Sequence, residues 1–149
     1  MTQTRFNTGL RSSDTAEWST PSEFYTQLNT QYGPFTLDPC ATTENAKCER
    51  FYTLEEDGLT QSWAGETVFM NPPYGAEIKE WMRKAWIESQ QGALVVCLVP
   101  SRTDTDWWHR FAMKGEVTFI RGRIKFGGAQ FNAPFPSAVV VFAPRTSNE

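Results

Sequence analysis

The stretch that decides how this chain folds is Thr67-Val68-Phe69-Met70-Asn71-Pro72-Pro73-Tyr74. Its apolar start predicts a strand, and the two prolines predict that the strand ends in a stiff turn. Prolines lack an N–H group, so the turn presents carbonyl oxygens and few donors, and Pro73 holds Pro72 extended. Asn71 adds a side-chain carbonyl and Tyr74 a flat aromatic ring. Such a corner could grip a planar amine, on a nucleobase or a glutamine; the alternative is an ordinary Pro-Pro loop.

Length and composition predict one globular domain. The chain has 149 residues, of which 40% are hydrophobic and 14% aromatic, enough for one core. Its net charge is −3, so any contact with nucleic acid must come from a local basic patch. Three cysteines without close pairing and one histidine predict neither a disulfide framework nor a metal site. No signal peptide or membrane-length apolar run occurs, so we expect a cytoplasmic protein with no membrane partner.

The first 17 residues differ in pattern from the rest of the chain. Residues 1–17 are polar and without periodicity, which predicts a flexible N-terminal arm. A single domain is expected over residues 18–149. It should begin with a short helix that Ser19 or Thr20 caps, with Pro21 in the first turn.

Alternating strands and helices are predicted further along. The clearest helix is residues 76–91, where apolar side chains recur at helical spacing and Glu80 should pair with Lys84. A second helix is expected at residues 105–113. The expected strands are residues 35–37, 50–53, 67–70, 93–99, 116–120 and 137–143. This order favours an α/β fold with a mostly parallel sheet, flanking helices and a C-terminal antiparallel hairpin.

Polar residues follow three of the expected strands. Ligands in such sheets bind at the carboxyl ends of the strands, where Asp38, Asn71 and Arg102 should meet. Asp38 could accept from an amine or a ribose hydroxyl, or it could only form a turn. Asp57 has the same two interpretations. No Gly-x-Gly-x-x-Gly pattern follows the first strand, so a standard dinucleotide site is not predicted.

A basic stretch lies between the last two expected strands. If it is extended, Arg121, Arg123 and Lys125 point to one face, which suits DNA phosphates. The alternative is a solvated edge strand that its charges protect from aggregation. Arg102, beside the expected pocket, is a further phosphate contact.

Four other side chains could have either a functional or a purely structural role. One of Trp107 and Trp108 is expected in the core, and the other could stack on DNA. His109 is expected on the surface. Cys40 either lines a pocket or packs as a small hydrophobic residue.

Six short motifs follow one another along the chain. They are Trp18-Ser19-Thr20-Pro21, Asp38-Pro39-Cys40-Ala41, Asp57-Gly58-Leu59, Asn71-Pro72-Pro73-Tyr74, Pro100-Ser101-Arg102-Thr103-Asp104 and Gly122-Arg123-Ile124-Lys125-Phe126. Together they resemble the phage-type DNA N-6-adenine methyltransferase (Dam) family over roughly residues 18–143.

This resemblance implies a truncated Rossmann-like methyltransferase fold that acts on double-stranded DNA, with S-adenosylmethionine as the cofactor and no metal. The implied catalytic residues are Asn71, Pro72, Pro73 and Tyr74. The implied cofactor contacts are Thr20, Pro21, Asp38, Pro39, Cys40, Asp57 and Asn71. Asp38 departs from the wider pattern because no glycine-rich turn follows it. Residues 41–67 are also too short for two strand–helix units, so that half of the sheet should be trimmed.

The implied reaction methylates the amino group of an adenine that has flipped out of the duplex and stacked on Tyr74. An enzyme encoded by a phage would act in the host cytoplasm. A methyltransferase of RNA or of protein glutamine would also keep Asn71 and Tyr74. A non-catalytic DNA-binding module on the same fold is a third possibility. The target sequence and the oligomeric state do not follow from these residues.

Overall fold

The computed structural model describes residues 19–127 and 132–145. The expected arm at residues 1–17 and Trp18 lie outside the described residues. The helices are α2 (Ser22–Tyr32), η1 (Gly58–Thr60), α3 (Ile78–Gln90), α4 (Asp106–Arg110) and η2 (Ala112–Lys114), of which η1 and η2 are 3-10 helices. The strands are β1 (Thr67–Met70), β2 (Leu94–Pro100), β3 (Glu116–Phe119) and β4 (Ser137–Phe142).

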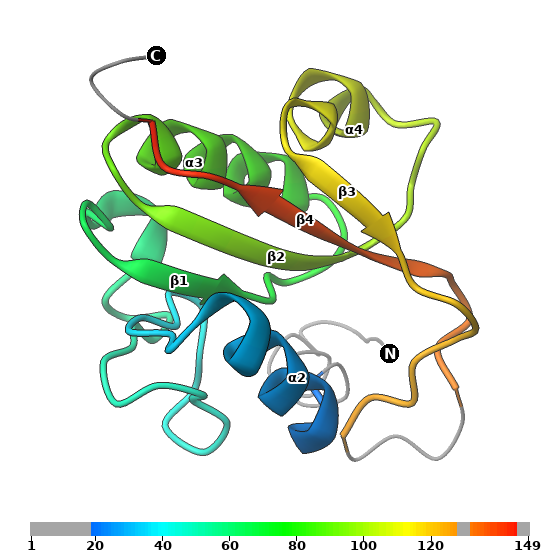
Figure 1. The fold of residues 1–149 in the computed structure, drawn as a ribbon, viewed down its shortest axis with the longest axis horizontal. Coiled ribbons are helices and arrows are strands. Elements are labelled where there is room, and N and C mark those ends of the chain that lie inside the picture. Colours follow the sequence, from blue (N-terminus) through cyan, green and yellow to red (C-terminus); the bar gives the residue numbers. More distant parts are fainter. Residues whose placement is uncertain (1–18, 128–131, 146–149) are drawn as a thin grey trace, which may run out of the picture.

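The strands form one mixed sheet in the order β1-β2-β4-β3 (Figure 1). β1 and β2 are parallel, whereas β4 runs antiparallel to both β2 and β3. The predicted antiparallel pairing of the last two strands is confirmed. The prediction of a mostly parallel sheet is wrong for the described strands, because β4 inserts between β2 and β3 and leaves β1–β2 as the parallel ladder. The fold class that the described residues show is mixed α/β.

Beyond β1 the sheet continues only through single bridges. Leu37 forms a parallel bridge with Val68, and Asp38 forms one with Phe51. The two short strands predicted here are therefore present as isolated bridges. Residues 41–66 contain η1 and no complete strand–helix unit, as predicted.

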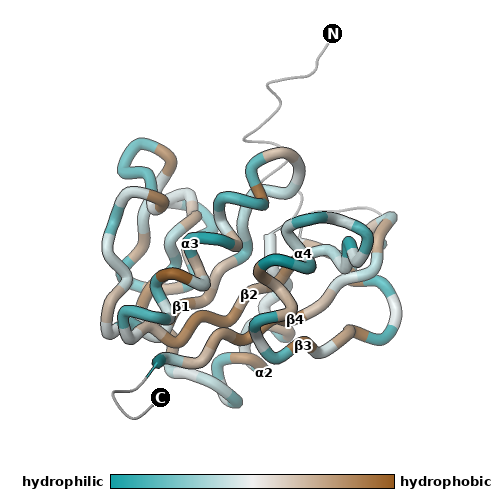
Figure 2. Tube along the Cα trace, turned by 90° about the horizontal axis from the view of Figure 1, so that it is seen from above, coloured by the Kyte–Doolittle hydropathy of each residue, from teal (hydrophilic) through white to brown (hydrophobic). Residues whose placement is uncertain are grey.

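β2 is the central strand of the core and is buried on both faces, as its continuous apolar sequence predicts. Val95, Cys97 and Val99 pack in the core cluster that α3 and α4 cover. Val96 and Leu98 pack in a second cluster, with α2 on the opposite face. Figure 2 shows the hydrophobic strands between α3 and α4 on one side and α2 on the other. The sheet is thus the middle of three layers.

Two details of the helices differ from the predictions. α2 has Pro21 at its N-cap and no side-chain cap hydrogen bond, so the cap predicted at Ser19 or Thr20 is wrong. The Thr20 hydroxyl instead accepts a hydrogen bond from Asn71. In α4 both Trp107 and Trp108 are buried, so neither can stack on DNA as the surface interpretation requires.

His109 is exposed, as predicted, and its ring hydrogen-bonds the Thr103 carbonyl. Thr105 caps α4 by accepting from Trp108 N at 3.3 Å. This capping bond starts the short helix that carries both buried tryptophans.

A buried ion pair ties α3 to the chain before β1. Glu88 is 7% exposed; it accepts from the backbone N–H of Trp63 and, at 3.1 Å, from the ammonium group of Lys84. The predicted pairing of Lys84 with Glu80 is therefore wrong. Lys84 also donates to the Gln61 carbonyl, so its side chain points toward the segment before β1.

Replacing Glu88 with alanine should strongly destabilise the fold. The Glu88→Ala variant leaves the Lys84 charge without its carboxylate and the Trp63 N–H without its acceptor, at a cost of about 3–5 kcal/mol in the free energy of unfolding. Urea denaturation followed by tryptophan fluorescence measures this cost. Glu80→Ala, an exposed change on the same helix, should stay within about 0.5 kcal/mol of the wild type. Equal midpoints for the two variants would contradict the assignment.

Candidate functional site

A cavity of about 720 Å³ lies at the carboxyl end of β1. Nine of the residues predicted for catalysis or cofactor binding line it: Thr20, Asp38, Pro39, Cys40, Asp57, Asn71, Pro72, Pro73 and Tyr74. They come from segments up to 54 positions apart, and the parallel bridge between Leu37 and Val68 places the first strand end beside the second. Pro21 does not line this cavity and stands at the N-cap of α2.

Two side chains hold the amide of Asn71. Its Nδ2 atom donates to the Thr20 hydroxyl at 3.0 Å, and its Oδ1 atom accepts from the Tyr74 hydroxyl at 2.7 Å. Thr20 is itself buried. Because both ends of the amide are engaged, the side chain has a defined orientation at the cavity wall.

Tyr74 is half-buried and its hydroxyl points into the protein. The hydroxyl reaches the Leu98 carbonyl at 3.2 Å in addition to Asn71. The rings of Phe126 and Phe135 stand nearly perpendicular to the Tyr74 ring, with centroids at 6.3 and 5.6 Å. Burial raises the pKa of Tyr74, which keeps the hydroxyl protonated and able to donate. The predicted stacking face is thus part of a packed aromatic corner.

Asp38 is a buried carboxylate on the cavity wall, only 5% exposed. Its Oδ2 atom accepts from Lys47 N at 3.0 Å and its Oδ1 atom from Cys40 N at 3.4 Å. Burial raises the pKa of Asp38 to about 6, because the two backbone donors offset only part of the desolvation. The group is therefore ionised at neutral pH, and a carboxylate can accept further hydrogen bonds from a ligand.

Asp57 and Gly58 bring a second loop onto the first. Asp57 has a left-handed backbone (φ 58°) and accepts from Leu59 N at 3.2 Å, so the turn interpretation is confirmed. It also lines the cavity, and its contact with a ligand stays a prediction. At Gly58 a Cβ atom would stand 2.1 Å from the Pro39 carbonyl oxygen, so only glycine permits this approach. Trp63 fixes the same turn by donating from Nε1 to the Gly58 carbonyl at 3.0 Å.

Cys40 lines the cavity and packs against the core cluster, so both of its interpretations hold. Burial raises the pKa of its thiol, which keeps it neutral. Within residues 19–127 and 132–145, no group of three or more His, Cys, Asp or Glu side chains could hold a metal ion. No helix in the same ranges is long and apolar enough to cross a membrane.

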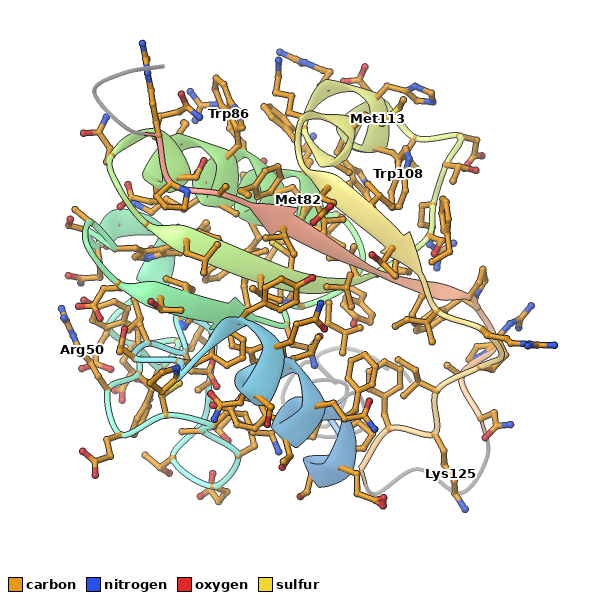
Figure 3. All side chains as sticks on the ribbon, in the orientation of Figure 1. Arg50, Met82, Trp86, Trp108, Met113 and Lys125 are labelled. Carbon is orange, nitrogen blue, oxygen red and sulfur yellow. The ribbon has the colours of Figure 1, made fainter. Side chains whose placement is uncertain are left out.

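The predicted phosphate contacts lie outside the cavity. Arg121, Arg123 and Lys125 are exposed, and exposed and buried side chains alternate over residues 123–126, as expected for an extended segment. Gly122 has a positive φ of 78° in a bend at residues 121–122, so the extended segment does not include Arg121. Lys125 projects away from the body of the protein (Figure 3).

Arg102 stands closer to the turn that begins at Asn71. It is exposed, and its guanidinium lies 5.8 Å from the centre of the Phe135 ring. It lines a small hollow of about 150 Å³ together with Gly75, which also lines the main cavity. Arg102 is therefore placed beside the site but not in it.

Two contributions were not predicted from the sequence. Trp81, expected only to pack, also lines the cavity. Phe135 supports the Tyr74 ring although it lies 61 positions further along the chain. Neither residue stands in a local pattern that distinguishes this role from ordinary packing.

The chain resembles known proteins over most of its length. Residues 7–143 match the family described as DNA N-6-adenine-methyltransferase (Dam). The chain is 34% identical over 92 residues to the DNA N-6-adenine-methyltransferase of Escherichia phage T1, which covers 61% of this chain and 38% of that protein. It is 29% identical over 150 aligned positions to the DNA N-6-adenine-methyltransferase of Haemophilus phage HP1 (strain HP1c1), covering 95% of this chain and 86% of that protein. The match thus spans well under two thirds of the phage T1 protein and most of the HP1 protein.

Adding one methyl group at Gly58 should disturb the cavity wall. In Gly58→Ala the new Cβ atom would overlap the Pro39 carbonyl oxygen, which is backbone and cannot turn away. We expect a loss of about 1–3 kcal/mol in unfolding free energy from overpacking, measured by thermal or urea denaturation. Gly127→Ala is the control, because its φ is not positive and the new Cβ atom would meet Ser19 only at ordinary contact distances of 3.4 and 3.7 Å. A Gly58→Ala protein as stable as the wild type would refute the close approach.

Proposed function

The chain belongs to the DNA N-6-adenine-methyltransferase (Dam) family, and we propose that it transfers a methyl group from S-adenosylmethionine to the exocyclic amino group of a flipped adenine in double-stranded DNA. The observation that carries this proposal is the held amide of Asn71 on the wall of a large cavity at the end of β1. A truncated Rossmann-like methyltransferase fold is part of the proposal. The parallel β1–β2 pair and the Leu37 bridge beside it support that fold.

The cavity fits a nucleoside cofactor that carries a positive charge. Its volume of about 720 Å³ falls in the range usual for small-molecule sites. Five carboxylates line it and one ammonium group does: Asp38, Glu44, Glu55, Asp57 and Glu77, against Lys47. A cavity with this charge favours a sulfonium cation. Asp38, the buried member, would accept from a hydroxyl or an amino group of the cofactor.

The adenine amino group is a weak nucleophile because its lone pair is delocalised into the ring. Asn71 Oδ1 and the Pro72 carbonyl would accept hydrogen bonds from the two N–H groups of this amine. These hydrogen bonds would favour a pyramidal nitrogen. Positive charge grows on this nitrogen as it attacks, so fixed oxygen dipoles stabilise the transition state more than the ground state. S-adenosylmethionine, when bound, would supply an activated methyl group with its sulfur as the leaving group. The nitrogen then releases a proton to solvent, and no general base is required.

DNA would bind outside the cavity, through its phosphates. Arg102, Arg121, Arg123 and Lys125 are exposed and carry the positive charge that this role requires. The acidic cavity would repel phosphates, so only an uncharged base enters it. The base would therefore leave the duplex and stack on Tyr74, which lines the cavity.

The decisive test is incubation of the protein with isotopically labelled S-adenosylmethionine and duplex DNA, followed by nucleoside analysis. We expect label in N6-methyladenine. Parallel reactions with RNA and with a glutamine-containing protein should stay unlabelled. Label only in one of these, or calorimetry that detects no cofactor binding, would reject the proposal.

Asn71→Ala should abolish methyl transfer while cofactor binding remains measurable. Removal of one fixed acceptor at the reacting nitrogen lowers the rate constant by about 100-fold or more. Single-turnover transfer measures the rate, and calorimetry with S-adenosylmethionine measures binding. Asn132→Ala, an exposed change away from the cavity, should transfer normally. Near-normal turnover by Asn71→Ala would reject the assigned role.

Cofactor affinity should fall as the pH is lowered through about 6. The pKa of Asp38 is raised to about 6, so the carboxylate is ionised above this pH and protonated below it. The protonated form attracts a cation less and accepts fewer hydrogen bonds. Titration calorimetry between pH 5 and 8 should show this loss, at roughly tenfold per pH unit below the pKa if binding requires the ionised form. In Asp38→Asn the affinity should be weak and nearly independent of pH; a retained pH profile would show that another group titrates.

A further inference from the structure

An exposed aromatic side chain stands at the end of β3. Phe119 is 62% exposed, which is rare for a large hydrophobic residue in the described part of the chain. One face of its ring stacks on Trp108, with centroids 6.1 Å apart and planes 19° from parallel. Trp108 is only 3% exposed and belongs to the core cluster that α3 and α4 cover. Phe119 is thus a rigidly backed ring with its other face toward solvent.

The sheet places this ring on the same edge as the catalytic turn. β3 runs in the same direction as β1 and β2, because β4 is antiparallel to both β2 and β3. Phe119 and Val99 both pair with Ala138, so Phe119 stands two residues beyond the level of Cys97, which pairs with Met70. Three strand spacings separate β1 from β3, roughly 14 Å. A flipped base swings by about 180° out of the helix, so a ring at this distance from the catalytic turn can still lie beside the bases that the adenine has left.

The segment of sequence that contains Phe119 is basic, in contrast to the rest of the chain. Residues 102–125 contain six Lys or Arg residues and three carboxylates, a net charge of +3 in a chain of net charge −3. The remaining residues therefore carry −6. Arg121 and Arg123 follow Phe119 directly and are exposed. A polyanion is the partner that this charge selects.

We propose that the exposed face of Phe119 stacks on the bases of duplex DNA beside the target adenine and stabilises the opened duplex. The inference rests on the proposed function, since it assigns a positioning role during base flipping. Flipping a base removes its stacking on both neighbours. An aromatic ring can replace part of this stacking on any sequence, because every base has a flat face. The adjacent arginines hold the phosphates while the ring contacts the bases.

Self-association along β3 is the competing use of this edge. In an antiparallel pairing of two copies that sets Phe119 opposite Glu116, Arg121 of one copy would face Lys114 of the other. Two positive charges at this position oppose the pairing. The charges therefore favour DNA over a second copy.

The test compares duplex and single-stranded DNA as substrates of the full chain. Phe119→Ala should slow single-turnover transfer to duplex by about tenfold or more, the size expected from loss of one stacked base. Transfer to single-stranded DNA should stay within about twofold, because no duplex is opened. Phe119→Trp should restore duplex activity, and Phe119→Leu, which keeps the packing on Trp108, should not. Thr118→Ala, an exposed neighbour on the same strand, is the matched control.

Each other outcome overturns the proposal in a distinct way. Equal losses on both substrates would mean that Phe119 serves general binding or folding, which circular dichroism and thermal denaturation of Phe119→Leu separate. Unchanged duplex transfer would remove the role altogether. A dimer of the wild type that Phe119→Ala dissociates, measured by analytical ultracentrifugation, would assign this edge to self-association. A wild type that methylates neither DNA substrate would reject the proposed function itself.

Discussion

The hydrogen bonds that hold the Asn71 amide join three distant parts of the chain. Thr20 lies 51 positions before Asn71, and Leu98, which accepts from the same Tyr74 hydroxyl, lies 24 positions after that tyrosine. The amide therefore has its orientation only when the segment before α2, the end of β1 and the middle of β2 are all in place. A site of this kind is pre-organised by the fold and does not need to be assembled by the ligand.

The same network accounts for the missing side-chain cap of α2. A threonine before a helix usually accepts from a backbone N–H of the first turn. Here Thr20 is buried against Asn71 instead, and Pro21 starts the helix without a side-chain cap. The cost is of the order of 1 kcal/mol in helix stability. Thr20 thus helps to orient the Asn71 side chain on the cavity wall and contributes no cap to the helix.

Local patterns predicted local structure, and partners distant in sequence were missed. β2 and α3 follow from an apolar run and a helical stripe, and the Asn71 corner follows from the stiffness of proline. The cavity residues after two strand ends were also predicted, because parallel neighbours end at one edge.

The insertion of β4 has no local signal, since antiparallel pairing with β3 alone fits the sequence equally well. Lys84 has a carboxylate four residues away in both directions, and only burial selects Glu88. The helix with Trp107 and Trp108 spans five residues, too few for a stripe to show which ring is buried.

The small size of the chain places a particular demand on its loops. In the described part of the chain the half of the sheet beyond β1 is reduced to single bridges, so no full strand and only the short helix η1 borders the cavity on that side. Two loops form the cavity wall there instead. Asp38 gathers the backbone of residues 40 and 47 around its carboxylate, and Gly58 lets the second loop touch the first at Pro39. Hydrogen bonds to a buried carboxylate and close backbone contact thus stabilise this wall in place of a larger apolar core. The wall that results is acidic. An acidic wall of this kind repels phosphate, which is why the proposed DNA contacts are the exposed basic residues outside the cavity.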